Sequence, residues 1–93
     1  VFTEPEKLKS DKDRDFIMNS LNDMGIECYS GSCSEIYKEK AFDKMFSDKR
    51  PSLKIAKELG ETSLMFLVHP TIQENDIYEI CDKTQKIIKQ FQR

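Results

Sequence analysis

The sequence predicts an α+β fold, an α/β sandwich in which a small, mostly antiparallel sheet of three strands carries helices packed on one face. Three observations lead to this prediction. One apolar run, Ser63 to Pro70, stands out in a chain of 93 residues that is 34% charged. Two short β-prone segments, 1–3 and 26–29, lie elsewhere in the chain. Amphipathic patterns with spacings of three and four residues separate these segments and indicate helices.

The apolar run is expected to be the central strand. Leu64 to Val68 are five consecutive apolar residues, bounded by Gly60-Glu61-Thr62 and by His69-Pro70. This length and punctuation are typical of a strand that is buried on both faces, and a helix of this length would be unusually short.

The two flanking strands are expected to be short. Val1-Phe2-Thr3 is β-prone but stops at Pro5, which has no N–H to donate to a sheet, so it suits only an edge position. Ile26 to Tyr29 alternates apolar with polar or small residues and leads into Ser30-Gly31-Ser32. That pattern predicts a second strand that enters a loop.

Three helices follow from apolar periodicity and end signals. The first is expected from Asp13 to Met24, followed by Gly25 at the position that favours a left-handed residue. The second, from about Leu53, is expected to end at Gly60. The longest is expected from Gln73 to Gln90.

Two parts of the pattern remain open. The last helix has two candidate starts: a capping box of Thr71 with Glu74, or one of Gln73 with Asp76. Residues 33–50 show weak periodicity that allows a helical turn or two, and the charged segments 38–40 and 43–50 are expected to form solvated surface.

Composition limits the classes of function. Fifteen Lys and Arg against 17 Asp and Glu give a net charge of -2 without a basic block, so nothing favours nucleic acid. No apolar run approaches the roughly 20 residues of a membrane-spanning helix. Three cysteines without a Cys-x-x-Cys motif suit a reducing, cytoplasmic location. We expect one domain, residues 1–93. We also expect a fragment of a longer protein, because Val1-Phe2-Thr3 looks like the end of a strand whose beginning is missing.

The sequence context of the histidine and the cysteines favours structural roles over catalytic ones. His69, the sole histidine, ends the apolar run with no acid or nucleophile beside it in sequence. Its spacing to Cys28, Cys33 and Cys81 matches no common zinc pattern. Cys81 falls on the apolar face of its helix and is expected in the core. No catalytic or metal-binding residue is therefore assigned.

The loop after the second strand is unusually rich in polar side chains that could bind a ligand. Tyr29-Ser30-Gly31-Ser32-Cys33-Ser34-Glu35 carries four hydroxyl groups, a thiol and a carboxylate on a backbone made permissive by Gly31. Such a loop suits a polyhydroxylated ligand. The alternative, a solvated Ser-rich turn, is the one that composition alone favours.

Three blocks, taken together, resemble the C-terminal part of the DegT-type (DegT/DnrJ/StrS) sugar aminotransferases, which use pyridoxal phosphate (PLP). They are Arg14 to Met18 with Gly25 to Tyr29, then the loop that ends in Lys40-Ala41-Phe42, and then Ile55 to Pro70 with Thr71 to Ile77. The last block is similar to the family's "SLPLHP" strand and acidic helix start. The sequence from Cys28 to Glu35 looks most like that of the subgroup that acts on dTDP-linked 4-keto-6-deoxy sugars, such as dTDP-4-amino-4,6-dideoxyglucose transaminases.

The resemblance implies the small C-terminal domain of a fold-type I aminotransferase, with the PLP-binding large domain and its lysine upstream, outside this chain. It implies a homodimer that moves an amino group from an amino-acid donor to a nucleotide-linked keto sugar, in the synthesis of polysaccharide sugars. The fragment alone would be inactive and bind no PLP. The family usually has a histidine in this loop, and the position that aligns with it in this chain is Cys33 or Ser34.

The expected sugar contacts therefore come from the loop itself, with Ser32, Ser34 or Glu35 in place of the imidazole. The full set of predicted substrate-binding residues is Tyr29, Ser30, Ser32, Cys33, Ser34 and Glu35. A rival hypothesis from another class is a free-standing interaction or regulatory module that binds a partner strand at the edge formed by Val1 to Thr3.

Overall fold

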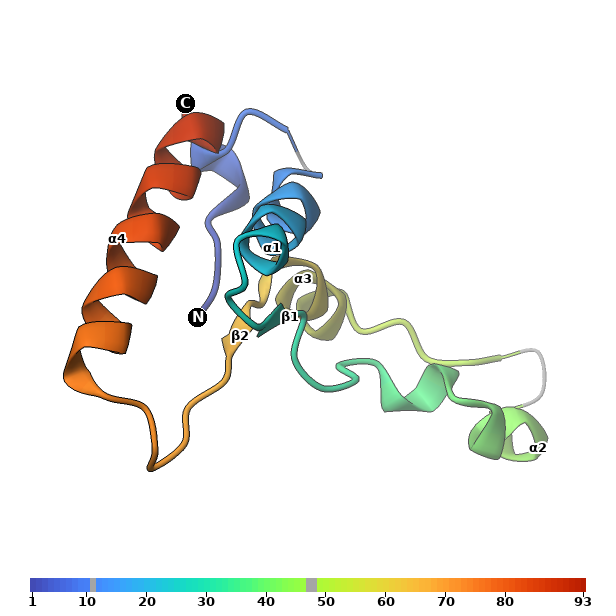
Figure 1. Ribbon diagram of the computed structural model, residues 1–93. Coiled ribbons are helices and arrows are strands. Elements are labelled where there is room, and N and C mark those ends of the chain that lie inside the picture. Colours follow the sequence, from blue (N-terminus) through green and yellow to red (C-terminus); the bar gives the residue numbers. More distant parts are fainter. Residues whose placement is uncertain (11, 47–48) are drawn as a thin grey trace.

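The computed structural model describes residues 1–10, 12–46 and 49–93 (Figure 1). Its elements follow in the order η1 (Pro5–Lys7), α1 (Asp13–Asp23), β1 (Cys28–Tyr29), η2 (Ile36–Lys38), η3 (Lys40–Phe42), α2 (Asp43–Phe46), α3 (Lys54–Thr62), β2 (Met65–Phe66) and α4 (Glu74–Phe91), where η marks a 3-10 helix. The predicted mixture of helices with a small antiparallel sheet is confirmed.

The sheet is smaller than predicted. β1 and β2 pair antiparallel, with Cys28 opposite Phe66 and Tyr29 opposite Met65. The segment Val1 to Thr3 reaches the chain just before β2 through one isolated bridge, Phe2 to Ser63. The expected three-stranded sheet is therefore reduced to two strands and a bridge, because Pro5 opens a 3-10 helix before the first segment can extend.

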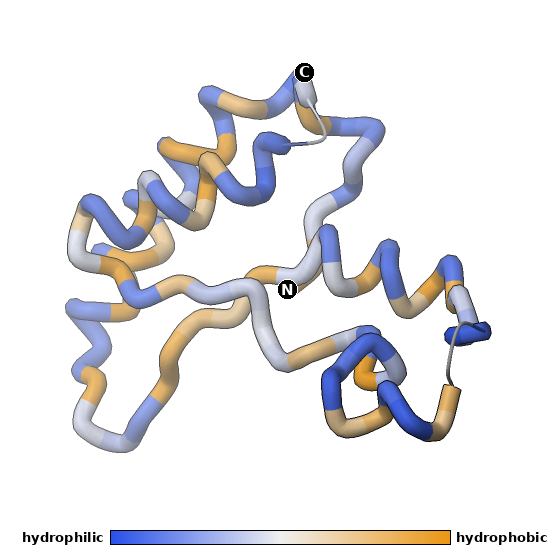
Figure 2. The backbone as a smooth tube through the Cα atoms, turned by 90° about the vertical axis from the view of Figure 1, so that its right-hand side faces the viewer, coloured by the Kyte–Doolittle hydropathy of each residue, from blue (hydrophilic) through white to orange (hydrophobic). Residues whose placement is uncertain are grey.

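The core lies where α1 and α4 pack on the sheet. Ile17 and Leu21 of α1 are fully buried, and Ile87 brings α4 into the same cluster. Leu64 and Cys28 close the cluster from the sheet side. Figure 2 shows hydrophobic and hydrophilic residues alternating along the helices, as expected when each helix buries one face.

The apolar run is buried on one face only, so the prediction of burial on both faces was wrong. Leu64 is 2% exposed and Phe66 half-buried, whereas Met65 and Leu67 between and beyond them are 45% and 46% exposed, and Val68 is 83% exposed. Alternate residues of a strand point to opposite faces, so the helices of the core cover the face of Leu64 and Phe66 while the face of Met65 and Leu67 stays open. Val68 lies beyond the end of β2 and outside this alternation.

Helix ends match the predictions at α1 and α4. Asp23 ends α1 and Gly25 takes a positive φ of 80°, as expected for its position. The capping box at α4 uses Gln73 with Asp76, not Thr71 with Glu74. Of the two candidate starts the second is therefore correct.

The second predicted helix, α3, does not end at Gly60. It continues to Thr62, and Gly60 keeps helical geometry without a positive φ. The glycine marks a close approach of the Ser-rich loop, described below, rather than a helix end. Most apolar side chains of α3 are exposed, Ile55 at 73% among them.

Residues 36–46 form an arm away from the core, built from η2, η3 and α2 (Figure 1). The radius of gyration is 16.2 Å, against roughly 12 Å for a compact chain of this length. The described residues of the segment 43–50 are exposed or half-buried, as predicted for solvated surface; Ser47 and Asp48 lie outside the described residues.

Candidate functional site

The Ser-rich loop borders a hollow of about 400 Å³ between β1 and the end of α3. Five of the six predicted contact residues line it: Ser30, Ser32, Cys33, Ser34 and Glu35. Tyr29 lies on β1 and is not among the lining residues. The rest of the wall comes from Lys38 and Glu39, which were expected as solvated surface, and from Lys57, Gly60 and Glu61 of α3, which sequence patterns did not connect with the loop.

The loop turns at Gly31, which has a φ of 88°. An L side chain rarely adopts this conformation, so glycine is favoured here. Beside it, the Ser63 hydroxyl donates to the carbonyl oxygen of Ser30. The loop start is thereby attached to the residue that precedes β2.

The loop then packs on the backbone of α3 at Gly60. A Cβ built on Gly60 would lie 2.1 Å from Ser34 Oγ and 3.0 Å from Ser34 Cβ. No real side chain tolerates the first distance, so the absence of a side chain at Gly60 creates the space for Ser34. This explains a glycine inside a helix, where it costs about 1 kcal/mol relative to alanine.

Glu35 is the most strongly held acidic group of the hollow. Its Oε1 accepts a hydrogen bond of 2.7 Å from the Tyr37 hydroxyl, and its carboxylate accepts from Lys38 Nζ at 3.2 Å. The Tyr37 hydrogen bond, followed by Lys38 and Lys57, lowers the pKa of Glu35, while partial burial opposes the shift. The same hydrogen bond raises the pKa of Tyr37. Glu35 is thus an ionised acceptor at neutral pH.

Cys33 is held as a neutral thiol. Its Sγ lies 3.2 Å from Glu39 Oε1, and this hydrogen bond to a carboxylate raises the pKa of the thiol. A thiolate is the reactive form of cysteine, so the arrangement disfavours a nucleophilic role. The hollow offers hydroxyls, carboxylates and ammonium groups, and its Cys33 thiol is kept in the neutral form by Glu39, which suits binding rather than bond breaking.

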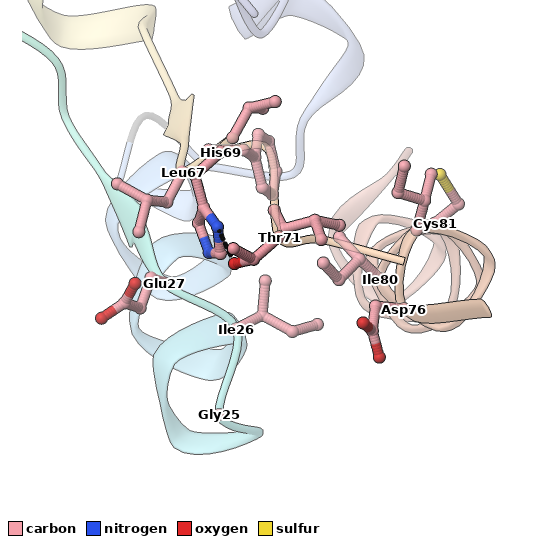
Figure 3. Close-up of a pocket in the computed structure, with 13 residues that line it drawn as sticks. Gly25, Ile26, Glu27, Leu67, His69, Thr71, Asp76, Ile80 and Cys81 are labelled. Atoms are coloured by element: carbon pink, nitrogen blue, oxygen red, sulfur yellow. Dashed lines mark hydrogen bonds between the residues drawn. The ribbon is translucent and has the colours of Figure 1, made fainter. Parts of the chain in front are cut away.

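A second cavity, of about 500 Å³, lies between the chain that follows β2 and the start of α4 (Figure 3). Its lining is largely apolar, with Ile26, Phe66, Leu67, Ile72, Ile77 and Ile80. His69 is exposed here and its Nδ1 is hydrogen-bonded to the Thr71 hydroxyl, while Asp76 caps the backbone N–H of Gln73 at 3.1 Å. Both polar groups therefore have structural partners.

The cysteines differ from the prediction at one position. Cys28 is buried, whereas Cys33 and Cys81 are exposed. Cys81 was expected in the core and that prediction was wrong, because the first half of α4 extends beyond the cover of α1 and leaves Ile77 and Tyr78 exposed as well. Within residues 1–10, 12–46 and 49–93, no group of three or more His, Cys, Asp or Glu side chains could hold a metal ion.

The lysines do not fit the attachment of PLP. Each one is exposed, apart from half-buried Lys83, which pairs with Glu79 on α4. A lysine that forms a Schiff base needs a lowered pKa, usually from burial, and no buried lysine is present in the part of the chain that the structure describes. Nor does any helix there have the length and apolarity to cross a membrane.

Comparisons with known proteins gave one informative match. Neither the protein-family profiles nor the curated sequences matched the chain. Among solved structures, the X-ray structure of the aminotransferase from Psychrobacter cryohalolentis is similar, with a TM-score of 0.84 and 42% sequence identity. The similarity covers 98% of this chain but 23% of that one, so the chain spans about a quarter of the aminotransferase. In fold and sequence, the chain is similar to a segment of an aminotransferase.

Proposed function

We propose that the chain is the C-terminal domain of a PLP-dependent aminotransferase of the DegT type. The parent enzyme transfers an amino group to a nucleotide-linked keto sugar, within the dTDP-4-keto-6-deoxy subgroup, for polysaccharide biosynthesis. It is a cytoplasmic homodimer. The observation that carries the proposal is the 42% identity to an aminotransferase over 98% of this chain.

The chain itself binds and does not catalyse. PLP, when bound by the parent enzyme, supplies the electron sink for amino transfer. Because no described lysine suits its attachment, no step on the cofactor is assigned to residues 1–93. The contribution of this chain is one wall of the sugar-nucleotide site.

That wall is the hollow beside the Ser-rich loop. The exposed hydroxyls of Ser32 and Ser34 can donate to or accept from sugar hydroxyls, and the Glu35 carboxylate accepts from them. The resemblance aligns the family's histidine with Cys33 or Ser34, and we infer that the neighbouring hydroxyls and Glu35 take over its contacts. Their mixed donor and acceptor character suits a polyhydroxylated ligand better than an apolar one.

The test starts from the complete reading frame that contains residues 1–93. The purified protein should show the visible absorbance of a lysine-bound PLP and transfer nitrogen from glutamate to dTDP-4-keto-6-deoxyglucose. Absence of both the absorbance and the transfer would overturn the proposed function. A native protein whose mass corresponds to this chain alone would do the same.

The loop is tested in the same protein. The triple variant Ser32→Ala, Ser34→Ala, Glu35→Ala should raise the KM for the sugar nucleotide about tenfold or more, since three polar contacts are removed. The KM for glutamate should stay unchanged. Matched controls are Ser52→Ala and Glu6→Gln, both exposed and outside the hollow. Equal KM values in variant and wild type would remove the loop from the site.

A second candidate function is a free-standing interaction module. It is favoured by the exposed apolar side chains, Val68 at 83% and Phe2 at 60% among them. Phe2 lies on the edge segment that the rival hypothesis assigns to a partner strand. The native mass separates the two candidates, because the module would be a protein of about the 10.9 kDa of this chain.

A further inference from the structure

Tyr37 connects the Ser-rich loop with the start of α3. Its hydroxyl donates to Glu35 Oε1 at 2.7 Å and accepts from the backbone N–H of Leu53 at 3.1 Å. Leu53 is the N-cap residue of α3. One phenol group therefore joins the end of the loop to a helix sixteen residues further along the chain.

The main chain of Tyr37 is held as well. Arg50 Nη1 donates to its carbonyl oxygen at 3.0 Å. Tyr37 is half-buried, and hydrogen bonds hold both its carbonyl oxygen and its hydroxyl. The hydroxyl has a defined orientation, because its O–H donates a hydrogen bond to Glu35 while a lone pair of its oxygen accepts from the Leu53 N–H.

Tyr37 does not line the hollow, whereas Glu35 does. A carboxylate offers about four acceptor sites, and the bonds from Tyr37 and Lys38 leave capacity for a ligand hydroxyl. Without Tyr37, Glu35 would keep one partner, the flexible and exposed Lys38. The orientation of the carboxylate would then be lost while its charge remained.

We propose that Tyr37 is a positioning residue for the sugar nucleotide: it fixes the Glu35 carboxylate in the wall of the hollow so that this carboxylate accepts a hydroxyl of the sugar. The inference rests on the proposed function of the chain. It adds a residue outside the hollow whose effect on substrate binding passes through Glu35.

The experiment compares the complete wild-type enzyme with its Tyr37→Phe variant, which keeps the ring and removes the hydroxyl. We expect the KM for dTDP-4-keto-6-deoxyglucose to rise about three- to tenfold, as for the loss of one hydrogen bond of ordinary net strength, with kcat and the KM for glutamate unchanged. Glu35→Gln should have a similar effect, and the double variant should add little to either single one. Tyr78→Phe is the matched control, because its hydroxyl contacts Glu74 on α4, away from the hollow.

A second readout needs no turnover. Loss of the Tyr37 hydroxyl leaves the Leu53 amide without its partner, so hydrogen exchange at the start of α3 should accelerate in Tyr37→Phe and not in Tyr78→Phe. Faster exchange without a change in KM overturns the inference, since the contact would be structural only. Unchanged exchange overturns it too, as does a loss of kcat together with thermal stability.

The two proposals fail in different ways. A wild-type enzyme that transfers no amino group to a keto sugar overturns the proposed function and this inference with it. An active wild-type enzyme with an additive double variant overturns the positioning role of Tyr37 alone, because independent residues give additive effects.

Discussion

Ser34 Oγ lies in the space that a side chain at Gly60 would occupy, 2.1 Å from the place of its Cβ. The relationship joins two segments that sequence patterns describe separately, a Ser-rich loop and an amphipathic helix. Glycine at position 60 thereby sets how deeply the loop packs on α3. Glycine lowers the intrinsic stability of the helix, and in return the loop packs closely against the helix backbone.

Replacing Gly60 by alanine tests this packing. In a free helix the change would stabilise by about 1 kcal/mol, but here the new Cβ meets Ser34. We expect Gly60→Ala to give no such gain in the free energy of unfolding and to raise the KM for the sugar nucleotide about as much as Ser34→Ala does. Denaturant unfolding and steady-state kinetics measure the two effects.

The double variant supplies the control. With the Ser34 hydroxyl removed by Ser34→Ala, the nearest atom becomes Ser34 Cβ at 3.0 Å, which a small shift accommodates. Gly60→Ala should therefore be more stabilising in the Ser34→Ala background than in the wild type. Equal effects in both backgrounds would show that the two residues do not touch.

The Glu35 and Tyr37 pair predicts a pH dependence of stability. The folded state lowers the pKa of Glu35, chiefly through the Tyr37 hydrogen bond. The contribution of this pair is therefore present above the ordinary glutamate value of 4.5 and is lost as the pH falls through the lowered folded-state value. The same hydrogen bond raises the pKa of Tyr37 from its ordinary value of 10.0, so the contribution is present below pH 10.0 and is lost as the pH rises through the raised folded-state value.

Thermal midpoints across pH measure this window. The difference between wild type and Glu35→Gln should be constant near neutral pH and shrink as the pH falls below 4.5 and through the lowered folded-state pKa of Glu35, where the native carboxylate becomes protonated. Glu6→Gln serves as the control, since the exposed Glu6 side chain makes no hydrogen bond or ion pair within residues 1–10, 12–46 and 49–93. A difference that grew towards low pH would contradict the assigned sign.

Periodicity predicted the helices well because α1 and α4 bury regular apolar stripes, Ile17 and Leu21 on one and Ile87 on the other. It failed for the apolar run, since the pattern cannot tell that the face of Met65 and Leu67 lacks a covering layer or that the strand ends before Val68. The loop composition pointed to the hollow. The contribution of Gly60 and Tyr37 could not be predicted, because both act across contacts between segments distant in sequence.

Replacing a buried leucine should lower the free energy of unfolding far more than replacing an exposed one. Leu21 is fully buried between α1, α4 and the sheet, so Leu21→Ala leaves a cavity and should cost about 2–5 kcal/mol. Leu53, 54% exposed, is the matched control, and Leu53→Ala should change stability by about 0.5 kcal/mol or less. Native-state hydrogen exchange at the amides of α1 measures both. Similar values for the two variants would contradict the assigned core.

The three cysteines should differ in their rates of alkylation by iodoacetamide, followed by peptide mass spectrometry. Cys28 is 1% exposed and should react only after unfolding. Cys33 is exposed, but its hydrogen bond to Glu39 raises the pKa of the thiol, so Glu39→Gln should speed its reaction at pH 8. Glu61→Gln, in the same hollow, is the control.

Alkylation also reports on the ligand. If the hollow binds the sugar nucleotide, the bound sugar covers Cys33 and should slow its reaction in the complete enzyme, while Cys81 on α4 keeps its rate. Protection of both cysteines would indicate a change in folding stability instead of local cover. Protection of neither, at a saturating concentration of sugar nucleotide, would place the ligand elsewhere, since an exposed thiol beside Ser32 and Ser34 cannot stay accessible under a ligand that contacts both hydroxyls.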